Sequence, residues 1–241
     1  MEHPAGNAAE RPHTTQRPVG KPLWRPLTEG APFIAPLVAA GTAAAWLFPL
    51  VTPVAFAMAA GVALAFRDPP RKVTQQPSTA LAPADGRVMH VSRVWDDYWQ
   101  TELVEVAVFL ALWDVHIQRS PLAGEIVAQR RRAGGYRPAM TRAATHGNNQ
   151  LSTYLRTAAG PCTVTQISGM VARRIVRWAR TGKTLTQGER LGMIKFGSQV
   201  TLRLPTDSAI LVSAGDRVRA GITPVAQVAI VGALDKHSHH W

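Results

Sequence analysis

The chain has 241 residues, enough for one domain of ordinary size with appendages, and Lys and Arg exceed Asp and Glu by 27 to 15. Such an excess of positive charge indicates an anionic partner or an Arg-rich genome, and no zinc-ligand set, RNP-like motif or helix-turn-helix signature accompanies it. We therefore expect no nucleic-acid partner, and Cys162, the single cysteine, excludes an intramolecular disulfide.

The first 66 residues divide into a polar leader and an apolar segment. Residues 1–30 are rich in Pro, His, Arg and small polar residues, which predicts disorder. Residues 31–66 contain no Asp, Glu, Lys, Arg or His, and their length suits two short helices in a hairpin, one tilted span or a re-entrant pair. Basic residues flank this segment on both sides, which predicts a membrane-associated segment with both ends in the cytoplasm. A hairpin buried in a protein core is disfavoured because the segment has no polar stripe.

Residues 67–241 form a separate unit in which short apolar runs alternate with turn signals. We predict a mainly β (α+β) domain, built as a β-sandwich or a partly open barrel and preceded by an N-terminal apolar helical hairpin. Within it, only Val171–Arg180 has the spacing of a short helix. Two glycine-bounded turns, at 182–188 and 215–221, resemble the hairpins of biotinyl/lipoyl domains.

Three polar residues stand at the ends of apolar runs. Ser198, with Gly197 before it, directly precedes the alternating strand pattern "QVTLRLP". Asp85 lies in the turn "PADG", and His116 follows the run "VEVAVFLALWDV". Each has a sufficient structural explanation when taken alone, and the sequence contains no Walker loop, GxGxxG, HExxH, GxSxG or CxxC motif.

The contexts of these residues, taken together, resemble the phosphatidylserine decarboxylase family, in its short, membrane-anchored prokaryotic form. The resemblance rests on "AFRDPPR", "APADGRV", "FLALWDVHIQRSPLAGEI", "GNN", "VTQISGMVARRIV" and "GERLGMIKFGSQVTLRLP". These motifs occur in the order of the family and cover roughly residues 64–222.

The resemblance implies that the chain cuts itself between Gly197 and Ser198. The hydroxyl of Ser198 would attack the Gly197 carbonyl, and Ser198 would end as a covalent pyruvoyl group. The products are a β chain, 1–197, and an α chain, 198–241, which stay together as a heterodimer, while assembly into a higher oligomer is left open. The pyruvoyl group then forms a Schiff base with phosphatidylserine, and release of CO2 gives phosphatidylethanolamine.

The family pattern also suggests roles for individual residues. His116 is expected to be the base in self-cleavage and the proton donor in decarboxylation, with Asp85 orienting or polarising it. Longer members of the family carry a second histidine where this chain has Arg119. Weaker candidates for substrate binding are Arg119, Asn148, Asn149, Arg173 and Arg174. His146 is left without a role, and no metal site is expected.

The sequence therefore predicts a carboxy-lyase at the cell membrane, with its active domain on the cytoplasmic side. Two alternatives stay open. One is a pyruvoyl-dependent decarboxylase of a soluble amino acid, which the apolar segment does not favour. The other is a non-catalytic, membrane-tethered β domain in which Gly197-Ser198 is only a bulge.

Overall fold

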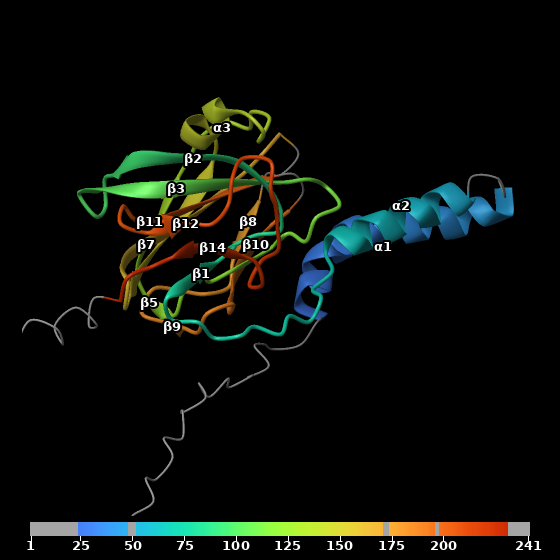
Figure 1. Ribbon diagram of the computed structural model, residues 1–241. Helices are drawn as coiled ribbons and strands as arrows, with labels where there is room; N and C mark the ends of the chain where they lie inside the picture. Colours follow the sequence, from blue (N-terminus) through green and yellow to red (C-terminus); the bar gives the residue numbers. More distant parts are fainter. Residues whose placement is uncertain (1–23, 48–51, 171–173, 196–197, 231–241) are drawn as a thin grey trace, which may run out of the picture.

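The computed structural model describes residues 24–47, 52–170, 174–195 and 198–230. Two helices come first, α1 (Trp24–Leu47) and α2 (Thr52–Ala65), and they lie side by side and project from a domain made mostly of strands (Figure 1). The helical hairpin expected from the sequence is thus confirmed. Within the described ranges, no helix combines the length and the hydropathy that crossing a membrane requires.

Helix α1 begins earlier than the sequence indicated. Residues 24–30 were predicted to belong to the disordered leader, but they form the first turns of the helix. The Glu29 carboxylate lies 2.9 Å from the Lys195 ammonium, which also donates to the Glu29 carbonyl oxygen at 2.8 Å. Gly30 packs so closely on Phe66 that a Cβ atom there would lie 2.8 Å from the ring. These partners are distant in sequence, so local composition could not reveal them. Residues 1–23 lie outside the described residues.

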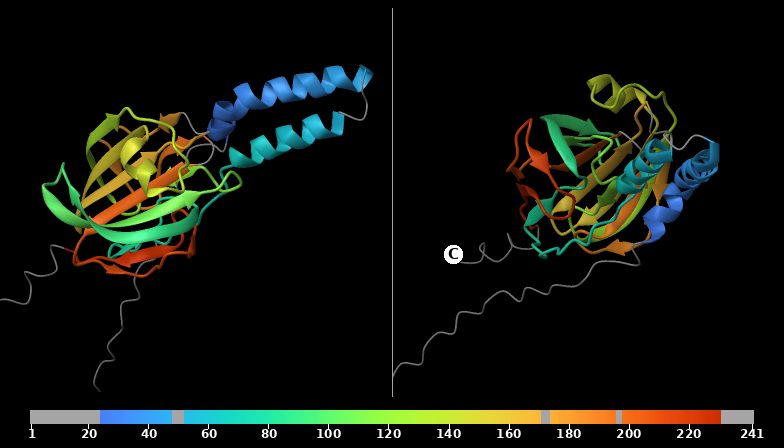
Figure 2. Two further views of the ribbon diagram at one scale, coloured as in Figure 1. Left: turned by 90° about the horizontal axis from the view of Figure 1, so that it is seen from above. Right: turned by 90° about the vertical axis from the view of Figure 1, so that its right-hand side faces the viewer.

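The strands form one large curled sheet and two small sheets (Figure 2). The large sheet comprises β2 (Gly86–Asp96), β3 (Thr101–Leu110), β5 (Gly124–Arg132), β6 (Gln150–Thr157), β7 (Gly160–Ile167), β9 (Thr184–Leu185), β11 (Ser198–Pro205) and β13 (Arg217–Val218). Its strand order is β13-β2-β3-β11-β7-β6-β5-β9, with antiparallel neighbours throughout.

The small sheets have three strands each. One consists of β1 (Thr79–Leu81), β12 (Ala209–Ile210) and β14 (Pro224–Gln227), in the order β1-β14-β12. The other consists of β4 (Ile117–Arg119), β8 (Ile175–Arg177) and β10 (Arg190–Ile194), in the order β4-β10-β8. A short helix, α3 (Arg142–Gly147), precedes β6. The predicted mainly β fold class is confirmed, and the likeness of two turns to lipoyl hairpins stays a prediction.

Strand β11 lies in the middle of the large sheet, between β3 and β7. Val200, Leu202 and Leu204 are fully buried in the main hydrophobic core. Because side chains alternate along a strand, Thr201 and Arg203 face the other side of the sheet. The alternation read from "QVTLRLP" therefore describes the real strand.

The prediction of a short helix over 171–180 is wrong in its described part. Ile175–Arg177 is strand β8, which pairs with β10 through Ile175↔Ile194 and Val176↔Met193. The β-branched residues of this segment suit a pleated sheet, and the pairing satisfies backbone groups that a three-residue stretch could not satisfy alone.

Candidate active site

Four neighbouring strands of the large sheet start or end along one border of the sheet. This border of strand ends is called the sheet edge here, and it holds the predicted serine. β3 ends at Leu110 and β7 ends at Ile167, whereas β11 begins at Ser198 and β6 begins at Gln150. The antiparallel registers place Leu110 opposite Ser198, and Ile167 opposite both Gln150 and the residue that follows Ser198. Chain segments far apart in sequence therefore meet around the start of β11.

The side chain of Ser198 is fully buried at this edge. Its Oγ atom has no hydrogen-bond partner among the described residues. Burying a hydroxyl without a partner costs free energy, so such a group in a folded protein calls for an explanation beyond packing. Gly197, the other half of the predicted scissile bond, lies outside the described residues.

His116 lies between the two chain segments that flank this serine. On one side, β3 ends opposite Ser198, and a turn over residues 111–114 leads from there to His116. On the other side, the His116 carbonyl oxygen accepts the N–H of Ile194, at 3.1 Å, in the strand that leads toward the scissile position. The histidine is buried and so lies away from bulk water, on a segment that both of these chain segments approach.

One nitrogen of the His116 ring is held by the backbone. Nδ1 lies 2.7 Å from the carbonyl oxygen of Asp114, and because a carbonyl can only accept, Nδ1 carries the proton in the neutral ring. Nε2 is then the basic nitrogen. Burial lowers the pKa of His116, and the hydrogen bond to Asp114 with the nearby charge of Asp85 opposes this only in part. The ring is therefore neutral at neutral pH, as a general base must be.

A chain of buried amides supports His116, and the sequence analysis did not find it. Gln118 Nε2 donates to the His116 carbonyl oxygen at 3.0 Å, and Gln166 Nε2 donates to Gln118 Oε1 at 2.7 Å. Gly192 packs against this chain, since a Cβ atom there would lie 3.2 Å from Gln166 Nε2. Polar residues at alternating strand positions usually face solvent, so only the packing of the small sheet on the large one identifies these glutamines.

Asp85 pairs with an arginine, and no described hydrogen bond joins it to His116. Its Oδ2 lies 2.7 Å from Arg71 Nη2, and its Oδ1 accepts the N–H of Ala220 at 2.8 Å. Its negative charge still raises the pKa of His116, so it acts on the ring through space. The group that orients the ring is the backbone carbonyl of Asp114, in the "DVH" motif. The side-chain pattern of the sequence does not indicate a role for a backbone group.

Arg119, a weaker candidate for substrate binding, is buried in an ion cluster. Its guanidinium donates to Asp68 Oδ1 and to the Gly188 carbonyl oxygen, both at 3.0 Å. The other Asp68 oxygen lies 2.5 Å from Arg190 Nη2. Burial lowers the pKa of Arg119 to about 10, which still leaves it charged at neutral pH. These contacts favour a structural role, in which the Asp68 cluster (Asp68, Arg119 and Arg190) joins the end of the hairpin to β4 and β10.

The two asparagines lie beside the same sheet edge and make different contacts. Asn148 is buried, and its side chain bonds the N–H and carbonyl of Arg137 and the carbonyl of Ser168 at 2.7–2.9 Å. The Asn149 carbonyl oxygen accepts both the N–H and the hydroxyl of Ser168. Asn148 thus fastens the loop before β6 to the end of β7, next to the start of β11.

An arginine-rich hollow of about 490 Å³ contains Arg174, another predicted substrate-binding residue. The side chains that line it belong to Gln129, Arg131, Leu151, Arg174, Ile175, Val176, Arg177 and Arg180. The described residues that line it thus include four arginines and no acidic residue. The carbonyl oxygen of Arg174 accepts the N–H of Lys195. Lys195 is three residues before Ser198, so the chain between Lys195 and Ser198 spans at most about 11 Å. Arg173 lies outside the described residues.

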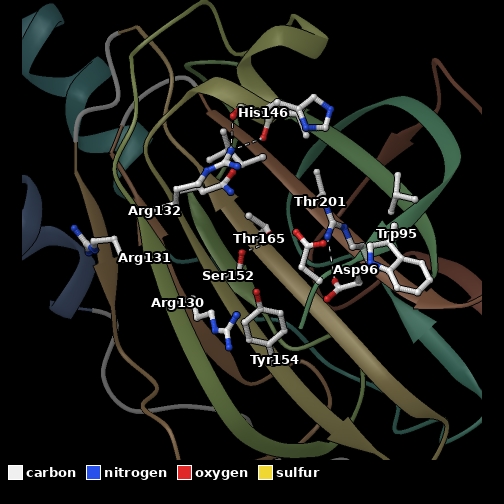
Figure 3. Close-up of a pocket in the computed structure, with 16 residues that line it drawn as sticks. Trp95, Asp96, Arg130, Arg131, Arg132, His146, Ser152, Tyr154, Thr165 and Thr201 are labelled. Carbon is white, nitrogen blue, oxygen red and sulfur yellow. Dashed lines mark hydrogen bonds and ion pairs between the residues drawn. The ribbon is translucent and has the colours of Figure 1, made fainter. Parts of the chain in front are cut away.

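A second hollow, of about 560 Å³, lies on the face of the large sheet that points away from the main hydrophobic core (Figure 3). Thr201 and Arg203 line it, and these residues alternate along β11 with the core residue Val200. Arg203 lies 3.1 Å from Asp96 there, and the exposed His146 stands at the rim. Of the predicted catalytic residues that the structure describes, Ser198, His116 and Asp85 do not line this hollow.

Within the described ranges, no group of three or more His, Cys, Asp or Glu side chains could hold a metal ion. Cys162 is fully buried in the core, and burial raises the pKa of its thiol far above the usual range. The thiol therefore stays protonated and unreactive. The chemistry available at the sheet edge is that of a hydroxyl and an imidazole.

Comparison with known proteins extends this picture. A family model described as phosphatidylserine decarboxylase matches residues 58–226. A phosphatidylserine decarboxylase proenzyme from Aromatoleum aromaticum is 39% identical over 164 residues, covering 68% of this chain and 76% of the relative. The proenzyme of the same name from Burkholderia ambifaria strain MC40-6 is 38% identical over 164 residues, covering 68% and 77%. A Methanopyrus kandleri protein, provisionally named an archaetidylserine decarboxylase proenzyme, is 39% identical over 208 residues, covering 81% and 95%.

Proposed function

This chain belongs to the phosphatidylserine decarboxylase family, and we propose that it cuts its own backbone before Ser198 and then converts phosphatidylserine to phosphatidylethanolamine and CO2. The observation that carries this proposal is the buried Ser198 hydroxyl, which has no hydrogen-bond partner among the described residues. The segment that carries His116 supports it, because this segment follows β3, which ends opposite Ser198, and accepts a hydrogen bond from Ile194. A structural bulge would need neither a buried hydroxyl nor a neutral imidazole at this place.

The proposed self-cleavage uses groups of this chain alone. His116 Nε2 takes the proton of the Ser198 hydroxyl, and Oγ bonds to the carbonyl carbon of Gly197. The peptide C–N bond then breaks as its nitrogen gains a proton, which leaves an ester. Loss of the Ser198 α-proton expels the carboxylate of residue 197 and leaves dehydroalanine, which water converts to a pyruvoyl group with release of ammonia. Burial of His116 keeps its ring neutral and ready for the first step.

The Ser198 hydroxyl, which has no hydrogen-bond partner within the described ranges, fits a residue that is consumed to make this group. The pyruvoyl carbonyl supplies an electrophile for the substrate amine and a sink for the electron pair that CO2 leaves behind. The neutral Nε2 of His116 takes the proton that the substrate ammonium loses, and with Nδ1 held by Asp114 the ring delivers a proton to the substrate carbon after CO2 departs. The charge of Asp85 favours this transient protonated state, because it opposes the larger effect of burial, which lowers the pKa of His116.

The two fragments are expected to stay together after the cut. β11 belongs to the α chain, and it pairs along its whole length with β3 and over five residues with β7, both of the β chain. Its core residues Val200, Leu202 and Leu204 are fully buried between them. Separation would expose a central strand on both edges and both faces.

The substrate's phosphodiester is assigned to the arginine-rich hollow. Arg174 is exposed and lies near the start of β11, and its neighbours in the hollow add positive charge without any carboxylate. Guanidinium groups match phosphate oxygens well, so an anionic head group would be attracted to this place. We place the apolar hairpin at the lipid surface, with the β domain on the cytoplasmic side, because basic residues follow α2.

A denaturing gel with intact mass measurement tests self-cleavage. The wild-type chain should give two fragments, with the smaller one beginning at a blocked residue 198, whereas Ser198→Ala should stay whole. Ser208→Ala is the matched control and should leave cleavage intact, because Ser208 is also buried and its Oγ has no hydrogen-bond partner in the part of the chain that the structure describes. A wild-type chain that stays whole would refute the proposal in favour of a non-catalytic domain.

Release of CO2 from cleaved protein then tests the substrate. Detergent-dispersed phosphatidylserine should be decarboxylated and free serine should not, because the apolar hairpin has no use in an enzyme for a soluble amino acid. Archaetidylserine is the third substrate to compare, since the relative from Methanopyrus kandleri matches over nearly its whole length. Turnover of free serine alone would replace the proposal with a soluble amino-acid decarboxylase.

A further inference from the structure

We propose that the turn carrying Leu112 and Trp113 is a second lipid anchor, which inserts into the membrane interface and brings His116 to the depth of the lipid head groups. This inference rests on the proposed function, because it assigns a lipid bilayer as the surface that the enzyme meets. It concerns a loop of the β domain and not the hairpin.

The turn presents two large apolar side chains at its tip. Leu112 is 50% exposed and Trp113 is 67% exposed. The turn itself is tight, since Asp114 N–H donates to the Ala111 carbonyl oxygen at 3.0 Å and Ala111 N–H donates to Asp114 Oδ2 at 2.9 Å. Two adjacent apolar side chains held outward on a braced turn form a binding feature, whereas a single scattered one would need no explanation.

The turn lies on the same side of the domain as the hairpin (Figures 1 and 2). Arg67, which follows α2, donates to the Leu64 carbonyl oxygen and, at 3.0 Å, to the Trp113 carbonyl oxygen, so the turn and the hairpin are tied together. Helix α2 itself exposes the apolar side chains of Val54, Phe56, Met58 and Leu64. The exposed tip is thus tied to the end of the apolar helices that we place at the lipid.

Tryptophan is suited to the boundary between hydrocarbon and water, because its ring is apolar and its N–H needs a polar partner. The head-group layer is about 5–8 Å thick on each side of a bilayer. His116 is three residues beyond Trp113, no more than about 11 Å along the chain. A tip at the base of the head groups would therefore hold the histidine within the head-group layer or a few ångströms above it, close to the serine carboxylate of the substrate.

The same turn holds the catalytic histidine in place. The Asp114 carbonyl, one residue after Trp113, accepts the Nδ1–H of His116. Contact with lipid would thus be made by a rigid unit that includes the orienting group. This coupling predicts that changing the anchor lowers the turnover of lipid in bilayers and has little effect on the turnover of dissolved substrate.

The experiment places an environment-sensitive NBD label on the full chain at Trp113→Cys. Native Cys162 does not compete for the label, because it is fully buried. The matched control is Trp95→Cys. Trp95 is 55% exposed in β2 and pairs with Glu102, which lies at the end of β3 away from the turn. Vesicles of phosphatidylcholine and phosphatidylglycerol are added, which contain no serine head group. The label at 113 should shift to the blue and gain intensity, and the label at 95 should not.

Partition and turnover complete the test. Trp113→Ala should bind these vesicles about tenfold more weakly, Trp113→Phe should recover most of the binding, and Trp95→Ala should match wild type. Turnover of phosphatidylserine in vesicles should fall with binding, while turnover of short-chain, dissolved phosphatidylserine should not change.

A label at 113 that stays in water on vesicle-bound protein would overturn the inference, as would equal shifts at both labels. Equal loss on both substrates would also overturn it. If wild type turns over neither substrate, the proposed function fails, while the vesicle measurements still decide the anchor.

Discussion

The substitution Asp68→Asn tests whether the buried ion cluster holds the active-site strands together. The Asp68 carboxylate is almost fully buried between Arg119 and Arg190, at 3.0 Å and 2.5 Å. Its neutral replacement removes the negative charge that lies between the two guanidinium groups. Breaking a buried pair in this way costs about 3–5 kcal/mol, a large share of a typical total stability of about 5–15 kcal/mol.

Urea unfolding, followed by circular dichroism, measures this cost. It is best done in the Ser198→Ala background, where an uncut chain can unfold reversibly. The control is Lys183→Gln, which removes an exposed partner from the Lys183–Glu189 pair and should cost less than about 1 kcal/mol. In the cleavable background, Asp68→Asn should also slow self-cleavage, because the cluster joins β4 to β10. If both substitutions cost the same, the cluster does not support the site and the reasoning fails.

Three further predictions concern the site and its frame. Self-cleavage should slow as the pH falls through the pKa of His116, which burial places below 6.5, so a fragment-yield profile with its midpoint at or above 6.5 would contradict a buried neutral base. Gly86→Ala should prevent stable folding, because Gly86 has φ +150° and a Cβ atom would lie 2.0 Å from the Phe109 carbonyl oxygen; soluble, fully cleaved protein would show otherwise. Gln118→Met should destabilise the fold by about 1–3 kcal/mol by leaving the Gln166 amide unpaired, and adding Gln166→Met should recover part of that loss in thermal unfolding.

Much of the fold could be predicted from sequence because its signals are local. Uncharged residues over a long segment indicate apolar helices, and alternation such as that of "QVTLRLP" indicates a strand with one buried face. The start of α1 and the nature of Ile175–Arg177 were predicted incorrectly, because both depend on distant partners. Lys195 and Phe66 hold the first turns of α1, and β10 supplies the hydrogen bonds that make residues 175–177 a strand.

The sequence by itself determined the division into an apolar helical segment and a mainly β domain, the family resemblance and the residue types that chemistry would need at Gly197-Ser198, His116 and Asp85. It could do so because motifs and side-chain periodicity are written in consecutive residues. Only the tertiary structure decided that the Asp114 carbonyl orients His116, that Arg119 is engaged by Asp68, and which buried amides support the site. Those contacts join strands through antiparallel registers and the packing of two sheets, and such pairings have no signature within any single stretch of chain.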